Sequence, residues 1–242
     1  MYKAKGLLDR QVRLLEYLTS GEAIFDDGCG SLRDPILQGI DRRLLHIEAR
    51  FSHEKRMDKI AAVFPKTLAL LGEDRDAVVR EFVHACPSAD IGRLENARQF
   101  SNFLISRWGT RRPALPYLPD VTACEVACAQ VRMDADSSPA VAKSRSHAGA
   151  FEIRRKPGIA LLRTRFDIRP IFEDKRAEIS PFERLIPLAI SFQAGELGIF
   201  ELAPEVFDLL AALGSWTAVD ELPDAEGLIA DLGEAGLLEE RR

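Results

Sequence analysis

The first half of the chain places apolar residues three and four positions apart, the spacing that turns one face of a helix toward a core. This pattern runs over residues 6–18 and again through residues 34–51 and 55–72. Because proline lacks the N–H of a helical turn, Pro65 is expected to kink the third stretch or to start a new helix. Residues 20–35, rich in Gly and Asp, are predicted to form a loop.

Three further helical stretches follow, separated by turn-forming segments. They cover residues 74–86, 96–108 and 120–133. The sequence therefore predicts an all-helical domain over residues 1–135. The next residues, 136–148, are small and polar without apolar periodicity, and they are predicted to be a linker.

From residue 149 the hydrophobic period changes to two, which indicates strands. Three strands are expected, and a turn at residues 194–196 joins the second and third in a hairpin. Three helices then complete the chain, the last ending at Gly236. The strands are predicted at residues 159–168, 185–193 and 197–203, and the helices at 204–214, 217–223 and 224–236. This order over residues 149–242 is that of a small winged-helix module, so the predicted fold class is α+β.

Charge distinguishes two uses of a winged helix, which are DNA recognition and the addition of a leader peptide as an extra strand. The chain carries 38 acidic and 33 basic side chains, a formal charge of −5. A DNA-reading helix needs Lys or Arg to neutralise phosphates, yet the last predicted helix contains acids and no basic residue. We therefore expect no nucleic-acid partner. The alternative is a transcriptional regulator that binds DNA through the arginines of residues 154–169.

Those arginines alternate with apolar residues, and three roles are open to them. They could form internal salt bridges, contact an acidic face of a partner protein, or bind carboxylates of a peptide. Internal salt bridges are the expected role for any single arginine, with each exposed pair contributing about 0–1 kcal/mol.

Capture of a peptide requires an exposed strand edge with free backbone groups and an apolar groove for alternate side chains. The third predicted strand, beside the last helix, offers both. The residues expected to bind peptide are Leu197, Gly198, Ile199, Phe200, Glu201 and Leu202 of the strand, and Leu228, Ile229 and Leu232 of the helix. The alternative for each apolar residue is a place in the core of the domain.

The sequence contains no arrangement of side chains typical of catalysis. Cys124 and Cys128 are four residues apart, and His84 precedes Cys86 by two, but neither pair has the spacing of a zinc site. There is no Ser/His/Asp arrangement and no glycine-rich phosphate motif. We expect no catalytic residue, no metal ligand and no cofactor in this chain. A metalloenzyme that uses its cysteines and histidines is the third alternative.

The sequence also bears on where the protein acts. No apolar run approaches the roughly 20 residues that span a bilayer, and the amphipathic first stretch lacks the apolar segment of a signal peptide. The four cysteines are expected to be reduced thiols, because such a chain has no secretion signal. We therefore expect a cytoplasmic protein without a membrane partner.

Two clusters of basic residues could lie on a solvated surface or contact another protein. One cluster, within a predicted helix, comprises Arg50, Lys55, Arg56 and Lys59. The other precedes the proline-rich segment 113–119, which is expected to be rigid and exposed. The predicted partner interface comprises Arg111, Arg112, Pro116, Tyr117 and Leu118, with Arg154 and Arg155 of the second domain.

Several stretches of the sequence resemble a bacterial family labelled as a DNA-binding domain. In the helical half these stretches are EARFSHEKRMDKIAAVFPKTLALLG, REFVHACP, NARQFSNFL and PYLPDVTACEVACA. In the second half they are FEIRRKPGIALLRTRFDI and IPLAISFQAGELGIFELAPEVFDLLAAL, so the resemblance covers most of the chain. EARFSHEKRM and CEVACA are similar to the MbnC branch of the family, which accompanies MbnB in methanobactin biosynthesis.

The resemblance implies a companion subunit that has no metal ligands or catalytic acid of its own. Its partner in a heterodimer is an iron-dependent, TIM-barrel-like oxidase of the MbnB type. The oxidase holds the iron and converts a Cys of a ribosomally made precursor peptide to an oxazolone with an adjacent thioamide. The companion subunit binds the leader of that precursor. The resemblance also implies that the DNA-binding label reflects the winged-helix shape.

Overall fold

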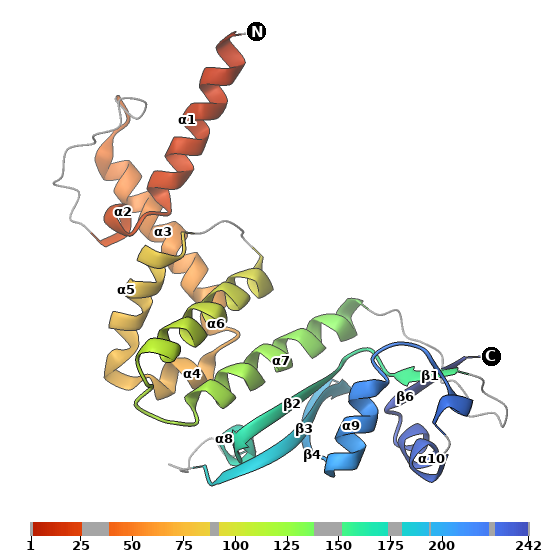
Figure 1. The fold of residues 1–242 in the computed structure, drawn as a ribbon. Helices are drawn as coiled ribbons and strands as arrows, with labels where there is room; N and C mark the ends of the chain where they lie inside the picture. Colours follow the sequence, from red (N-terminus) through yellow and green to blue (C-terminus); the bar gives the residue numbers. More distant parts are fainter. Residues whose placement is uncertain are drawn as a thin grey trace. The chain divides into compact units, whose positions relative to one another are not determined.

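The computed structural model describes residues 2–25, 39–87, 92–137, 152–173, 181–193, 195–222 and 226–241. Within these ranges it combines helices with two three-stranded sheets, so the α+β class expected from the sequence is confirmed (Figure 1). The chain divides into two compact units, Met1–Leu118 (unit 1) and Pro119–Arg242 (unit 2). No helix in the described ranges is long and apolar enough to cross a membrane.

Unit 1 is helical, and the predicted helices at residues 6–18, 74–86 and 96–108 are confirmed. Pro65 begins a new helix, because at the first helical position its missing N–H has no partner to lose. The elements of unit 1 are α1 (Tyr2–Leu18), α2 (Gly21–Phe25), α3 (Arg42–Ala61), α4 (Pro65–Leu70), the 3-10 helix η2 (Gly72–Asp74), α5 (Arg75–Ala85) and α6 (Arg93–Thr110).

The connection between α1 and α3 differs from the prediction in two respects. Helix α2 lies inside the predicted loop, and its residues Gly21, Ala23 and Ile24 are buried. Helix α3 begins only at Arg42, because the Asp41 side chain accepts a hydrogen bond from the Arg43 N–H at 2.8 Å and caps the helix. Residues 26–38, which include Cys29 and the predicted start of this helix, lie outside the described ranges.

Three phenylalanine rings form the centre of unit 1. Phe64, Phe82 and Phe100 are completely buried. The ring centroids of Phe64 and Phe100 are 5.4 Å apart, and those of Phe82 and Phe100 are 5.1 Å apart, both in edge-to-face contact. These rings come from the N-cap of α4, from α5 and from α6, so aromatic contacts hold the three helices together.

Unit 2 contains helices and six strands within its described residues. Its elements are α7 (Leu118–Ser137, beginning at the boundary), β1 (Glu152–Arg155), β2 (Ile159–Phe166), α8 (Arg169–Glu173), β3 (Glu183–Gln193), β4 (Glu196–Glu201), α9 (Pro204–Ala212), β5 (Thr217–Ala218), the 3-10 helix η3 (Val219–Glu221), α10 (Glu226–Glu234) and β6 (Leu238–Arg241).

The first sheet is antiparallel and has the order β2–β3–β4. The predicted hairpin between β3 and β4 is confirmed by the pairing of Gln193 with Glu196. Gly195 in the turn has a φ of 85°, in the left-handed region that favours glycine. The strands predicted at residues 159–168, 185–193 and 197–203 therefore form one sheet.

The second sheet, of order β5–β1–β6, departs from the predicted plan of three strands followed by three helices. The segment predicted as a helix at residues 217–223 forms β5 and η3 instead, because Thr217 pairs with Ile153 of β1. Strands β1 and β6 were not expected. The last helix ends at Glu234, and Gly236, with a φ of 69°, turns the chain into β6.

Helix α7 belongs to unit 2, whereas the sequence assigns it to the helical domain. Near its start, Asp120 Oδ2 accepts hydrogen bonds from the backbone N–H groups of Arg165 and Phe166 in β2, at 2.8 and 2.9 Å. Farther along, the Arg132 guanidinium lies 6.0 Å from the ring centroid of Phe192 in β3. The units therefore divide at residue 118 and not in the predicted linker, most of which lies outside the described residues.

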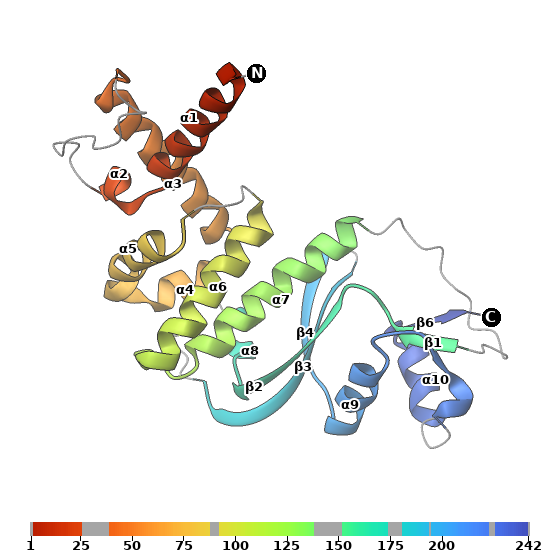
Figure 2. The same ribbon diagram turned by 45° about the horizontal axis from the view of Figure 1, so that its top comes forward.

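Helices α7 and α9 cover opposite faces of the β2–β3–β4 sheet (Figures 1 and 2). The α9 residues Phe207 and Asp208 both contact the Arg163 guanidinium, which lies 4.6 Å from the Phe207 ring centroid. Arg163 pairs with Pro187 of β3 and shares its face, whereas Phe192, which Arg132 of α7 contacts, lies on the other face.

We expect replacement of Asp120 by alanine to lower the free energy of unfolding of unit 2 by about 2 kcal/mol. The ladder of β2 shifts register between Thr164 and Phe166, and the carboxylate accepts the two N–H groups at this bulge. Burial raises the pKa of Asp120, so its surroundings also tolerate a neutral acceptor. Asp120→Asn keeps one acceptor oxygen and should be less damaging. Urea unfolding measures both variants, and equal losses would contradict this role.

Candidate functional site

The predicted peptide-binding strand, β4, lies at an edge of its sheet. It pairs only with β3 among the described residues. The Leu202 N–H donates to the Pro187 carbonyl at 2.9 Å. Because backbone groups of an antiparallel strand alternate in direction, the N–H groups of Leu197, Ile199 and Glu201 point away from β3. The outer edge of β4 therefore presents three backbone N–H groups and their carbonyls to a further strand.

The side chains of β4 offer apolar surface beside this edge. Leu197 and Ile199 are half-buried, and Phe200 is 56% exposed. The Phe200 ring occupies the space where a side chain at position 198 would lie. Gly198 therefore allows this exposed ring to lie across the strand. An added peptide strand would find apolar side chains on both faces of β4.

An ionic network fixes the end of β4. Glu201 Oε2 lies 2.8 Å from Arg169 Nη2 and 3.0 Å from Arg184 Nη2, so its side chain is committed within the unit. Arg169 also contacts Asp167 Oδ2 at 2.6 Å. The hydrogen bond from Arg169 lowers the pKa of Asp167, and the same bond raises the pKa of Arg169. These pairs join the residues after β2, the start of β3 and the end of β4.

The α10 residues predicted to complete the peptide groove lie elsewhere. Leu232 is 5% exposed, in a core cluster with Ile153, Leu210, Leu213 and Leu238. Leu228, Ile229 and the β4-flanking Leu202 pack against the same cluster. In both views α9 lies between β4 and α10 (Figures 1 and 2). For these α10 residues the structure favours the core role, the alternative left open by the sequence.

The arginines of β1 and β2 have partners within unit 2. Arg154 contacts Glu239 at 2.6 Å, Arg163 pairs with Asp208, and Arg165 contacts Glu183 at 2.6 Å. Arg155 donates to the Leu210 carbonyl at 3.3 Å, and burial lowers its pKa. The expected internal salt bridges are thus present. Two of these arginines, Arg154 and Arg155, were predicted at the partner interface.

The remaining predicted interface residues divide into exposed and buried sets. Arg111, Arg112 and Pro116 are exposed. Tyr117 is 9% and Leu118 2% exposed, so this part of the proline-rich segment is not the exposed surface that we expected. Burial raises the pKa of the Tyr117 hydroxyl.

A different part of unit 1, on α1 and α3, exposes large apolar side chains that are not among the interface residues predicted from the sequence. Four lie on α1 and three on α3, with exposures between 47% and 63% for the set Leu7, Leu8, Val12, Leu15, Leu44, Ile47 and Phe51. The signal was in the sequence, because the apolar arc of α1 is wider than one neighbouring helix can cover. Large apolar side chains exposed on two neighbouring helices are a candidate surface for a protein contact.

Cys124 and Cys128 are both buried on α7. A hydrogen bond with Cys128 and burial together raise the pKa of the Cys124 thiol. A protonated thiol is a weak metal ligand and a good packing group. Among the described residues, no group of three or more His, Cys, Asp or Glu side chains could hold a metal ion. His147 lies outside these residues.

No protein-family model matches the chain, and no curated protein shows a significant match.

Proposed function

We propose that this chain is a non-catalytic companion subunit that binds the leader of a ribosomally made precursor peptide by strand addition at β4. The observation that carries the proposal is the outward-facing edge of β4, with the N–H groups of Leu197, Ile199 and Glu201 available to a new strand. Half-buried Leu197 and Ile199 and exposed Phe200 would set the register of the leader's side chains. In this reading unit 2 acts as a winged-helix-like recognition element.

The partner in this proposal is an iron-dependent oxidase of the MbnB type, which modifies a Cys of the bound precursor in methanobactin-type biosynthesis in the cytoplasm. The resemblance of residues 48–57 and 124–129 to the MbnC branch supports this assignment. The exposed apolar side chains of α1 and α3 support a role in a complex. A leader held in fixed register would deliver its Cys to the oxidase at high effective concentration. DNA binding has less support, because the arginines of β1 and β2 are paired with acids or carbonyls.

We expect a fluorescently labelled leader peptide to bind the full-length chain in a titration, with or without the oxidase. A scrambled leader of the same composition is the control, since strand addition requires apolar residues in alternate positions. Affinity for the true leader should exceed that for the scrambled one by about tenfold or more. Absence of binding at micromolar concentrations, both with and without the oxidase, would overturn the peptide-binding proposal. Binding of duplex DNA with a steep salt dependence would favour the regulator instead.

A further inference from the structure

Three of the four histidines in the chain gather around the short helix α2. His46 Nδ1 lies 2.9 Å from the Ala23 carbonyl oxygen. The rings of His53 and His84 contact Phe25, with centroid separations of 5.5 and 5.8 Å. His84 also occupies the space where a side chain at position 21 would lie, so Gly21 permits this packing. None of these residues takes part in the function proposed above.

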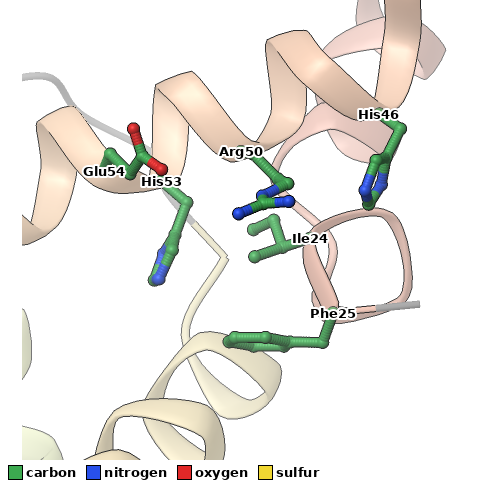
Figure 3. A pocket seen from close by; sticks show the side chains of 6 residues that line it. All are labelled: Ile24, Phe25, His46, Arg50, His53 and Glu54. Atoms are coloured by element: carbon green, nitrogen blue, oxygen red, sulfur yellow. The ribbon is translucent and has the colours of Figure 1, made fainter. Parts of the chain in front are cut away.

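A cavity of about 250 Å³ opens between α2 and α3 in this region, lined by Ile24, Phe25, His46, Arg50, His53 and Glu54 (Figure 3). The α3 members of this set occupy one face of that helix, which differs from the face that carries the buried residues Leu45, Ala49 and Ile60. In Figure 3 the side chains of Arg50 and His53 extend from α3 toward Ile24 and Phe25 of α2. The Arg50 guanidinium and the His53 imidazole thus face the apolar side chains of Ile24 and Phe25.

Both of these groups have hydrogen-bonding capacity that the described residues do not use. His53 Nδ1 is a buried atom with no hydrogen-bond partner among them. Arg50 likewise makes no hydrogen bond or ion pair with any described side chain or carbonyl. Buried polar atoms are almost always satisfied in folded proteins, so an unsatisfied one at a cavity wall points to an additional ligand.

The charges around the cavity favour a ligand with a single negative charge. Burial, followed by the nearby charge of Arg56, lowers the pKa of His53 and so favours its neutral imidazole. Glu54 adds a negative charge at the rim. The Arg80 guanidinium stacks on the Phe25 ring, 4.8 Å from its centroid, and Arg50 is the only Arg or Lys among the lining residues that the structure describes. A carboxylate balances that charge and accepts two parallel guanidinium N–H groups, whereas a phosphate dianion would exceed it.

We propose that this cavity binds a carboxylate carried on a small apolar group, with the Arg50 guanidinium and the His53 Nδ1–H as its hydrogen-bond donors. The apolar part contacts Ile24 and Phe25. The volume is slightly below the range of about 300–1,000 Å³ typical of pockets for drug-sized ligands, which limits the ligand to a small molecule or a single acidic side chain of a peptide.

Calorimetric titration of the full-length chain tests the proposal with two carboxylate probes. Phenylacetate represents a small-molecule source, and acetyl-alanyl-glutamyl amide represents a peptide side chain. Phenylacetamide, which has the same shape without the charge, is the control and should bind at least about tenfold more weakly than phenylacetate. Binding of either carboxylate identifies its source. Equal affinity for phenylacetate and phenylacetamide, or no binding of either carboxylate at millimolar concentration, would overturn the proposal.

Two variants locate the binding site. Arg50→Gln should weaken binding of the preferred carboxylate about tenfold or more, because a charged hydrogen bond is lost. Lys55→Gln removes an exposed positive charge from another face of α3, because five residues along a helix turn the side chain well away from Arg50, and it should leave the affinity unchanged. His53→Phe keeps an aromatic ring against Phe25 but lacks Nδ1, and it should weaken binding several-fold. If Arg50→Gln and Lys55→Gln bind the probe equally well, the carboxylate does not occupy this cavity.

Discussion

Replacing Ile199 by proline is expected to weaken binding of the precursor leader at least about thirtyfold, which corresponds to about 2 kcal/mol. The Ile199 N–H points to the outer edge of β4, where the leader would accept its hydrogen bond. Proline removes this donor, and its ring occupies the place of a carbonyl from the added strand. The hydrogen bonds between β4 and β3 are not affected, because they use other residues. Proline is tolerated on an edge strand when its nitrogen faces outward.

The matched control is Ile199→Ala, which removes the apolar side chain but keeps the outward N–H. It should reduce leader binding only moderately, through lost contact area. Circular dichroism and association with the oxidase should be unchanged in both variants, since neither alters unit 1. If Ile199→Pro folds and binds the leader as well as Ile199→Ala does, the added strand does not lie along β4. Leader binding itself is tested separately by the titration with the labelled peptide.

The hairpin that contains β4 shows which features can be predicted from local sequence. Alternating apolar residues on both sides of the turn at Gly195 predicted two paired strands, and this pairing is present. The sequence could not show what lies beside an element in space. The apolar residues of α10 were expected beside β4, but they pack on the small sheet formed by β5, β1 and β6. That sheet joins segments about 85 residues apart through strands of two to four residues, too short for a recognisable period.

Helix α3 shows the same difficulty in predicting which of several charged side chains is buried. Its periodicity predicted a helix, yet Arg50, Lys55, Arg56 and Lys59 were indistinguishable as members of one basic cluster. The structure separates them, because Arg56 is 7% exposed whereas Arg50 and Lys55 are exposed. The spacing of Arg56 from its apolar neighbours nevertheless indicated that it is buried. Arg56 follows Ala49 by seven residues and precedes Ile60 by four, which places it on the buried face of the helix.

Arg56→Leu should lower the free energy of unfolding of unit 1 by about 3 kcal/mol. The guanidinium donates three hydrogen bonds, to Asn96 Oδ1 at 3.0 Å, the Cys86 carbonyl at 2.8 Å and Gln99 Oε1 at 3.0 Å. It also lies 4.4 Å from the ring centroid of Phe82. Burial lowers its pKa, but no carboxylate is among these partners. Arg56 therefore connects α3, the end of α5 and α6 through neutral acceptors.

Leucine would leave these three acceptors without the guanidinium, and its shorter side chain would leave space beside Phe82. Lys55→Leu, at the exposed neighbouring position, removes one positive charge as well and should change stability by no more than about 0.5 kcal/mol. Urea denaturation of the full-length variants gives both values. Adding Asn96→Leu to Arg56→Leu should cost less than the sum of the single losses, because Arg56 and Asn96, which is 2% exposed, share one buried hydrogen bond that each single change already breaks. Strict additivity would show that the buried arginine contributes through packing alone.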